Sequence, residues 1–219
     1  MSYTGHVSPG GDADVRELTH LTITKVAVDP EMSNNCYLLR CHATNEQVLI
    51  DAAAEPDTLL GLLGGMPLAR VITTHRHQDH WSALPEVVAA TEAETIAGTD
   101  DVDGIPVRTG RPVRDNDSIE VGEVSLTVIH LVGHTPGSIA LLYDDPDGTP
   151  HLFTGDSLFP GGVGNTHGDG DAFRSLIDDV STKLFGRLPD ETWVYPGHGD
   201  DTTLGVERPH LDEWRSRGW

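Results

Sequence analysis

Apolar and polar residues alternate along short segments of the chain, as half-buried β-strands require. Leu18–Val28 is rich in apolar and β-branched residues in near alternation. Leu68–Thr73 is instead a short apolar run, which is typical of a strand buried on both faces. The same criteria predict strands throughout the chain, over residues 18–28, 35–40, 47–51, 68–73, 124–131, 138–143, 151–154 and 192–195.

Helical spacing of apolar residues is strongest over residues 173–188, where Phe173, Leu176, Val180 and Leu184 fall on one face. Strands and helices that mix along one chain indicate an α/β protein in which helices cover sheets. Shorter helices are predicted over residues 55–63, 81–90 and 206–214, the first of them closed by a Gly-Gly pair.

A chain of 219 residues is close to the roughly 100–200 residues of one domain, and it is long enough to bury a full core. Hydrophobic residues make up 37% of it, and 24 glycines bring the apolar share near that of ordinary globular proteins. We therefore expect a single domain over residues 18–219. Residues 1–17, which include Pro9-Gly10-Gly11, are expected to form a flexible polar lead-in.

The charge and hydropathy of the chain exclude several classes of partner. It has 35 acidic residues against 14 lysines and arginines, and the net charge of −21 repels phosphate backbones, which argues against nucleic acid. No apolar run approaches the roughly 18–20 residues of a membrane span, so no membrane partner is expected. The first residues carry neither the basic nor the apolar region of a secretory signal. A cytoplasmic location is the resulting expectation.

The two cysteines, Cys36 and Cys41, are five positions apart in a predicted strand. Side chains at an odd spacing point to opposite faces of a strand, so a disulfide between them is not expected. We interpret both as small buried apolar side chains.

The strongest chemical signal among the twelve histidines is a His-x-His-x-Asp-His cluster directly after the predicted strand 68–73. In an extended loop His75 and His77 point the same way and can chelate one ion. Asp79 and His80 follow two and three residues later, so they can face a neighbouring ion. Three imidazoles and a carboxylate within six residues suit Zn²⁺ or a similar transition metal.

Three more ligand-type residues each follow a predicted strand. They are His134 after strand 124–131, Asp156 after strand 151–154 and His198 after strand 192–195. Open α/β sheets gather their sites at the carboxyl ends of strands, and the glycines beside each residue allow close backbone approach. Together these residues supply the three ligands that the cluster lacks for two complete sites.

The ordered set of Asp51, the His75–His80 cluster, His134, Asp156 and His198 resembles the metallo-β-lactamase superfamily. The resemblance covers nearly the whole chain, from residue 33 to residue 199. It implies a four-layer αβ/βα sandwich, in which two mixed sheets pack together with helices outside and the metals lie at one edge.

The resemblance also implies a ligand set of two divalent metal ions, with zinc expected first and iron or manganese compatible. Metal one is assigned to His75, His77 and His134; metal two is assigned to Asp79, His80 and His198; Asp156 is expected to bridge the pair. A hydroxide that bridges the ions would be the nucleophile. Asp79 would be a ligand first and a proton acceptor second, and Asp51 would orient a ligand histidine.

Within the superfamily, residues 154–164 and 195–205 resemble the glyoxalase II-like thioesterases of the short bacterial kind, which implies hydrolysis of small acyl thioesters. Only 21 residues follow His198, too few for the helical C-terminal domain of longer members. Asn165 stands where glutathione-using members carry Lys or Arg, so a different thiol carrier is expected. His167 is close enough to this loop to be a substrate contact.

Other functions remain open at this point. A mononuclear iron persulfide dioxygenase of the same superfamily would use His75, His134 and Asp156, although residues 165–167 break its pattern. A β-lactamase would need a Cys late in the chain, and an RNA-processing nuclease would need a basic surface. A non-catalytic binding module would be expected to lose ligands, and all are present.

Overall fold

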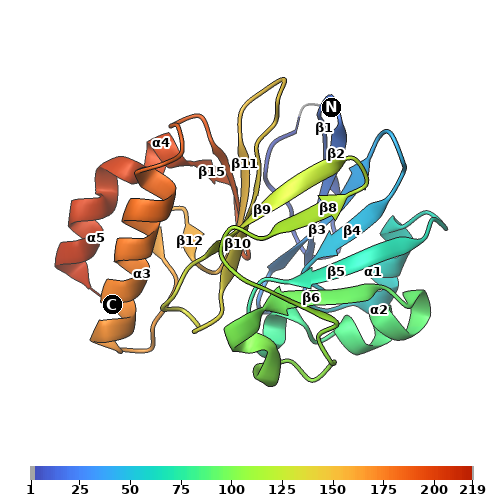
Figure 1. The fold of residues 1–219 in the computed structure, drawn as a ribbon, viewed down its shortest axis with the longest axis horizontal. Helices are drawn as coiled ribbons and strands as arrows, with labels where there is room; N and C mark the ends of the chain where they lie inside the picture. Colours follow the sequence, from blue (N-terminus) through green and yellow to red (C-terminus); the bar gives the residue numbers. More distant parts are fainter. Residues whose placement is uncertain (1–2, 219) are drawn as a thin grey trace.

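The computed structural model describes residues 3–218; residues 1, 2 and 219 lie outside the described part. Two mixed sheets pack against each other, and helices cover the outer face of each sheet, as Figure 1 shows. The four-layer αβ/βα sandwich expected from the sequence is therefore confirmed.

The first sheet has seven strands in sequence order. Its first four strands are antiparallel, and its last four, from β4 onward, are parallel. The helices α1 (Pro56–Leu62) and α2 (Leu84–Thr91) make the crossovers on both sides of β5. The strands are β1 (Asp14–Glu17), β2 (Leu21–Val28), β3 (Asn34–Cys41), β4 (Gln47–Ile50), β5 (Leu68–Thr73), β6 (Glu94–Gly98) and β7 (Arg111–Val113).

The second sheet has six strands in the order β15-β14-β11-β10-β9-β8, and only β11 and β14 pair in parallel. Its strands are β8 (Ser118–Val121), β9 (Val124–His130), β10 (Ile139–Tyr143), β11 (His151–Gly155), β14 (Trp193–Pro196) and β15 (Thr202–Thr203). A small hairpin of β12 (Leu158–Phe159) and β13 (Gly162–Val163) follows β11. The helices are α3 (Gly170–Asp179), which continues as a π-helix (Val180–Phe185), α4 (Leu204–Glu207), a 3₁₀ turn (Arg208–His210) and α5 (Leu211–Arg217).

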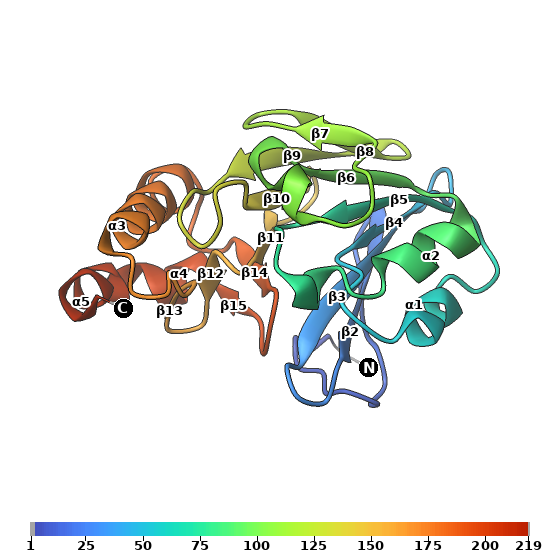
Figure 2. The same ribbon diagram turned by 90° about the horizontal axis from the view of Figure 1, so that it is seen from below.

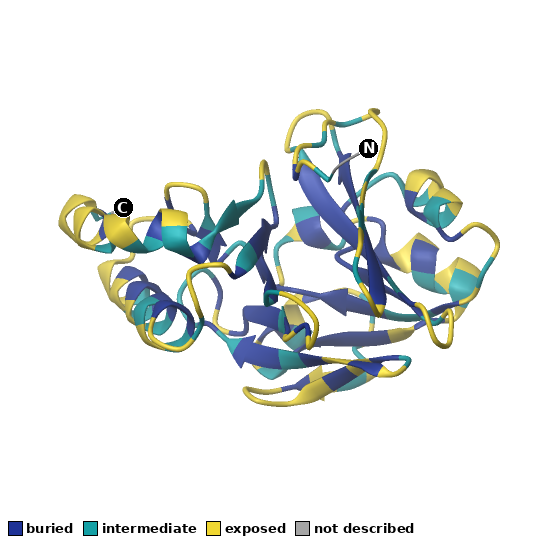
Figure 3. Cartoon of the chain, turned by 90° about the horizontal axis from the view of Figure 1, so that it is seen from above, coloured by how far each residue is buried: buried dark blue, intermediate teal, exposed yellow. Residues whose placement is uncertain are grey.

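Three apolar layers hold the sandwich together. The layer between the sheets includes Leu39, Phe153 and Tyr195. Leu59 and Val87 contribute to the layer under α1 and α2, at one end of the molecule in Figure 2, and a third layer lies under α3 and α5 at the other end. Figure 3 shows the strands buried and the outer faces of the helices exposed. Successive residues along a strand therefore contribute to different layers, one between the sheets and one beneath the helices.

The lead-in expected over residues 1–17 is wrong for its described part. Residues 14–17 form β1 and pair with β2, and the Asp14 carboxylate accepts hydrogen bonds from the Thr4 and Gly5 amides. Tyr3 packs against Trp193, 6.0 Å between ring centres. β1 was not predicted because three of its four residues are charged, and its one apolar residue, Val15, is exposed.

Several further boundaries differ from the prediction. The helix expected over residues 206–214 is divided into α4, the 3₁₀ turn and α5. The strand expected from residue 18 begins at Leu21, because the Leu18 amide bonds to the Leu21 carbonyl in the turn between β1 and β2. The helix expected over residues 173–188 begins earlier, where the Asp169 carboxylate caps α3, and its second half is the π-helix. Among the helices of residues 3–218, none combines the length and apolarity needed to cross a bilayer.

Cys36 and Cys41 are both buried and unbonded, as the sequence predicts. Cys36 belongs to the apolar layer beneath α1 and α2, whereas Cys41 belongs to the layer between the sheets. Their opposite orientation on β3 follows from the alternation of side chains along a strand.

The aromatic packing between the sheets gives a stability prediction. Phe153 is 1% exposed, and its ring centre lies 4.6 Å from that of Tyr195 and 5.3 Å from that of Tyr37. Phe153→Ala should lower the free energy of unfolding by about 3–5 kcal/mol through lost burial and a cavity. Val206→Ala, at a side chain 59% exposed, should change it by less than about 0.5 kcal/mol. Urea denaturation of both variants checks this, and equal losses would contradict the assigned core.

His151 gives a prediction for the pH dependence of stability. Its Nδ1 lies 2.9 Å from the Tyr195 hydroxyl, and burial, helped by the charge of Arg16, lowers the pKa of His151 to about 4. Between pH 6.5 and pH 4, His151 binds a proton in the unfolded chain but not in the folded chain. The stability that comes from neutral His151 is therefore lost as the pH falls through that window. The loss should reach about 3 kcal/mol.

The measurement compares the free energy of unfolding of the wild type and of His151→Asn at pH 7 and at pH 4. All other titrating groups are common to both proteins, so the difference between their two losses reports His151 alone. The wild type should lose more stability on acidification than the variant. Parallel losses would mean that His151 titrates normally in the folded chain.

Candidate metal centre

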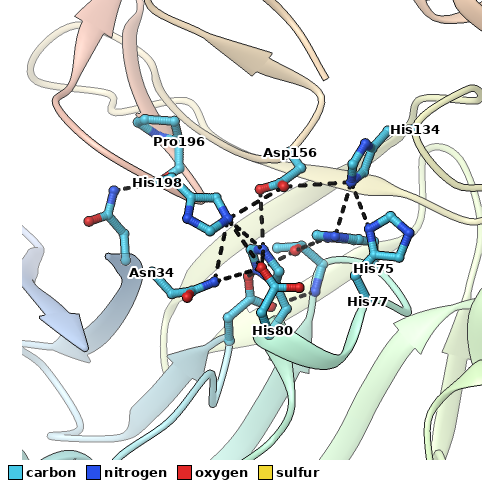
Figure 4. Close-up of polar contacts among 12 residues, drawn as sticks. Asn34, His75, His77, His80, His134, Asp156, Pro196 and His198 are labelled. Atoms are coloured by element: carbon cyan, nitrogen blue, oxygen red, sulfur yellow. Dashed lines mark hydrogen bonds and ion pairs between the residues drawn. The ribbon is translucent and has the colours of Figure 1, made fainter. Parts of the chain in front are cut away.

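The seven ligand-type residues singled out in the sequence lie together between the two sheets. Figure 4 labels all of them except Asp79. Four of them follow β5: His75 and His77 in the loop, and Asp79 and His80 in the 3₁₀ turn Gln78–His80. The other three follow strands of the second sheet, His134 after β9, Asp156 after β11 and His198 after β14. Each sheet thus contributes one side of the site.

One group within this site consists of three histidines. The Nε2 atom of His134 lies 2.9 Å from Nδ1 of His77 and 3.3 Å from Nε2 of His75. His75 is buried, and His77 and His134 are partly buried. Three ring nitrogens therefore converge on one point.

A second group consists of Asp79, His80 and His198. The Nε2 atom of His198 lies 3.3 Å from Nε2 of His80 and 3.3 Å from Oδ2 of Asp79, and His80 Nε2 lies 3.6 Å from the same carboxylate oxygen. His80 is fully buried. This group converges on a second point beside the first.

Asp156 stands between the two groups. Its Oδ2 atom lies 3.5 Å from Nε2 of His134 and 3.5 Å from Nε2 of His198, and its Oδ1 atom lies 3.2 Å from Nε2 of His80. A side chain at Gly197 would overlap the Asp156 carboxylate, so only glycine allows the strand end that carries His198 to approach this closely.

The spacing of these atoms fits metal ions. Ligands held at about 2.0–2.2 Å around a tetrahedral ion are separated by about 3.3–3.6 Å, and most of the distances within both groups fall in or next to that range. Asp156 Oδ1 is buried without a hydrogen bond of acceptable geometry, which leaves its lone pairs for a cation. The donor set of imidazoles and carboxylates suits zinc, iron or manganese.

In four of the histidines, the ring nitrogen that points away from the site, Nδ1, contacts another group of the protein. Such partners set the tautomer and the orientation of a ligand imidazole, so each near nitrogen points into the site. The partners are the Thr74 hydroxyl for His75 (3.1 Å), the Asp51 carboxylate for His80 (2.8 Å), the Asn165 carbonyl for His134 (2.8 Å) and the Met32 carbonyl for His198 (2.9 Å).

The carboxylates of the site are ionised. Burial alone would raise the pKa of Asp156, but the charge of His80 and the hydrogen bond from His198 outweigh burial and hold the pKa well below its usual range. The pKa of Asp79 is likewise lowered, because its hydrogen bond with His198 and the charge of His80 outweigh its burial. Both side chains are therefore ready to bind a cation.

The histidines divide into two classes. Burial, strengthened by neighbouring imidazoles, lowers the pKa of His75 and of His77. Burial also opposes charge on His80 and His198, but nearby carboxylates outweigh it, so the pKa of His80 lies well above its usual range and that of His198 rises to about 9. Protons on these two rings balance the carboxylates when no metal ion does, and metal binding would release them.

Two residues singled out in the sequence lie beside this centre. The Asn165 carbonyl contacts His134, whereas its exposed side chain accepts a hydrogen bond from the His167 amide. The His167 ring centre lies 6.1 Å from that of His77, and its backbone is left-handed with φ 54°. Both residues therefore lie at the rim of the three-histidine group.

Asn34 is a site residue that the sequence reasoning missed. Its Nδ2 donates to Asp79 Oδ2 at 3.0 Å and lies 3.4 Å from His198 Nε2. The side chain is buried and its Oδ1 atom has no hydrogen-bond partner. The available signal was its place in Ser33-Asn34-Asn35, the first segment of the family resemblance.

An open groove runs beside the second group. It has a volume of about 440 Å³ and is lined by Phe159, Pro160, His198, Gly199 and Asp200. The Phe159 ring centre lies 6.2 Å from that of His198, so an apolar wall adjoins the candidate metal position. A second groove of about 680 Å³ shares Phe159 and Pro160 and extends to Arg217 and Gly218.

A hydroxyacylglutathione hydrolase of Polaromonas sp. is 38% identical over 164 residues, which cover 74% of this chain and 60% of the relative. The chain thus spans about 60% of the length of that relative.

Two solved structures are similar over most of the chain. ETHE1 from Myxococcus xanthus has a TM-score of 0.76 at 32% identity, covering 86% of this chain and 82% of its own. TTHA1623, solved in a di-iron-bound form, has a TM-score of 0.71 at 32% identity, covering 84% of this chain and 96% of its own. The family model described as Metallo-beta-lactamase superfamily matches residues 29–198, and the chain belongs to that superfamily.

Proposed function

We propose that this protein is a metal-dependent hydrolase of small acyl thioesters that uses two divalent metal ions, with zinc first and iron or manganese also suited. The observation that carries the proposal is the convergence of seven ligand-type side chains into two adjoining groups that share Asp156. The 38% identical hydroxyacylglutathione hydrolase supports the substrate class.

In this proposal each group of side chains has one task. His75, His77 and His134 hold one ion, and the other ion is held by the group of Asp79, His80 and His198. Asp156 has one oxygen facing His80 and the other facing both His134 and His198, so its carboxylate serves both ions. When bound, two such ions would polarise a carbonyl and lower the pKa of bound water to about 7.

Residues outside the ligand set keep these side chains in place. Asp51 accepts hydrogen bonds from the Thr74 amide and hydroxyl and contacts His80 Nδ1, so one buried carboxylate orients two neighbours of the ligand loop. Asp79 serves mainly as a ligand, because a carboxylate with a lowered pKa is a weak proton acceptor. The apolar wall of Phe159 and Pro160 gives the acyl or thiol part of a substrate a surface beside His198.

We infer that the thiol carrier is not glutathione. Asn165, at the rim of the site, offers hydrogen bonds but no positive charge at the place where glutathione-using members of the family are expected to carry Lys or Arg. The net charge of −21 further disfavours a carrier with two carboxylates. A neutral or sugar-based thiol fits these observations better.

The persulfide dioxygenase is the second candidate. Its three ligands, His75, His134 and Asp156, are also neighbours, with His134 Nε2 3.3 Å from His75 and 3.5 Å from Asp156. A single iron would leave Asp79 and His198 without a metal although both converge on the second point. Metal content separates the two proposals: two ions per chain support the hydrolase, whereas one iron with oxygen consumption on a persulfide would replace it.

A matched pair of variants tests the roles of the two buried carboxylates. Asp156→Ala should abolish hydrolysis and reduce metal content for both ions, because its oxygens face both groups. Asp51→Ala should keep the ligands and lower metal affinity or rate by about 10–100-fold, as the loss of an orienting partner typically does. Elemental analysis and steady-state kinetics measure both effects. Full metal and full rate in Asp156→Ala would refute the bridging assignment.

The carrier proposal is tested with two thioesters. The wild type should hydrolyse a lactoyl ester of a neutral or sugar-based thiol with higher kcat/KM than S-lactoylglutathione. Asn165→Lys should raise kcat/KM for the glutathione ester alone, by about tenfold to a hundredfold, since a charge-assisted contact is worth about 1.5–3 kcal/mol. Asn165→Gln is the control without charge. High wild-type efficiency on S-lactoylglutathione that the Lys variant does not change would overturn the carrier proposal and leave the hydrolase intact.

A further inference from the structure

Two buried charged groups lie outside the candidate metal ligands. Each forms hydrogen bonds with the backbone next to one or more of those ligands. One is Asp101, in the 3₁₀ turn Thr99–Gly104 after β6. The other is the pair of Lys25, on β2, and Asp201, after the loop that carries His198. The side chains of all three residues are at most 1% exposed.

Asp101 links the two loops that carry the three-histidine group. Its Oδ2 accepts hydrogen bonds from the Arg76 amide, between His75 and His77, at 3.0 Å and from the Thr135 hydroxyl at 2.5 Å. Its Oδ1 accepts from the Gly137 amide at 2.9 Å. One carboxylate therefore fixes the distance between the loop after β5 and the loop after β9.

The contact between Asp101 and the His134 loop is close-packed. A side chain at Gly137 would overlap the backbone of Asp101, so the His134 loop lies directly against the turn. The side chain of Arg76 is 45% exposed and its Nε lies 3.9 Å from Asp101, so the charge of the carboxylate is stabilised mainly by hydrogen bonds from backbone amides and a hydroxyl. A buried carboxylate that lost these donors would be costly, so the loops are held firmly.

The Lys25–Asp201 pair holds the other loop. Lys25 Nζ donates to the Gly199 carbonyl, directly after His198, at 2.8 Å, and to Asp201 at 2.7 Å. Its third hydrogen bond goes to the Gly5 carbonyl at 2.8 Å. All three ammonium donors are thus used, and one of them fixes the residue that follows the ligand.

Asp201 extends this support to the N-terminal segment. Its Oδ2 accepts hydrogen bonds from the Tyr3 hydroxyl at 2.6 Å and from the Trp193 indole at 2.8 Å. None of these atoms contacts the three-histidine group. The His198 loop is therefore held by β2, by β14 and by the segment before β1.

We propose that Asp101 and the Lys25–Asp201 pair are positioning residues that each support one half of the metal centre: Asp101 the half of His75, His77 and His134, and the pair the half that contains His198. The inference rests on the two-ion assignment proposed above. It predicts that the two halves can be weakened separately from outside the ligand set.

The experiment measures Co²⁺ affinity in two backgrounds, by competition with a chromophoric chelator. His198→Ala leaves the three-histidine half complete, and His77→Ala leaves the His198 half complete. Asp101→Asn should weaken Co²⁺ binding about tenfold or more in the first background and leave the second unchanged. The double variant Lys25→Met/Asp201→Asn should weaken Co²⁺ binding in the His77→Ala background and leave it unchanged in the His198→Ala background. It leaves no unpaired buried charge.

Asp145→Asn is the matched control, because Asp145 is also a buried carboxylate that accepts from a backbone amide and a hydroxyl, at the opposite end of β10. It should leave both affinities unchanged. Circular dichroism checks that each variant folds. If Asp101→Asn does not fold, Thr135→Val replaces it; if the double variant does not fold, Tyr3→Phe replaces it. Each of these removes one hydrogen-bond donor to the carboxylate. They should show the same selectivity with a smaller effect.

Crossed selectivity supports the inference, whereas equal weakening of both halves, or of neither, overturns it. A wild-type stoichiometry of one ion would instead overturn the two-ion assignment and the inference with it. A protein that binds two ions with the expected selectivity but fails to hydrolyse thioesters would refute only the proposed substrate. The three outcomes are therefore distinguishable.

Discussion

The structure depends on how the charge of three carboxylates, buried or partly buried, is balanced. Asp51, Asp79 and Asp156 lie within one cluster, and every ion-pair partner that the described residues give them is a histidine. Buried carboxylates require compensating charge, which here comes either from protons on His80 and His198 or from metal ions. A divalent ion supplies that charge without the repulsion between two imidazolium rings whose Nε2 atoms lie 3.3 Å apart. The cluster therefore has the electrostatics that a cation site requires, before any family relationship is considered.

The backbone at this edge is shared between the sheets. The Ile139 amide at the start of β10 bonds to the Thr74 carbonyl after β5, and the Asn35 amide of β3 bonds to the Gly197 carbonyl after β14. Each bond joins the first sheet to the second beside a ligand residue. The apolar layer between the sheets sets their separation, and these bonds set their register at the edge. Ligands from distant parts of the chain therefore meet without a long flexible loop.

The sequence predicts those features whose cause is local. His75, His77, Asp79 and His80 are adjacent in the chain, and the longer strands have clear alternation, so both were readable. The strands β6, β7 and β8, of five, three and four residues, were not predicted, because each contains at most two large apolar residues. Asp101 was not singled out because its partner Thr135 is 34 residues away, and a buried aspartate after a strand has no distinctive pattern. Long-range polar contacts of this kind appear only once the chain is folded.

The division of the proposed metal ligands between the two sheets would couple metal binding to the fold. Four ligand residues follow β5 of the first sheet, and His134, Asp156 and His198 follow strands of the second. Any ion held by one group is therefore bonded to both sheets. A ligand that binds only the folded chain stabilises it by RT ln(1 + [L]/Kd), about 2.7 kcal/mol at a free concentration of one hundred times Kd. The ions that would supply the chemistry would also join the two halves of the sandwich at this edge, so the catalytic requirement and the structural one would act on the same residues.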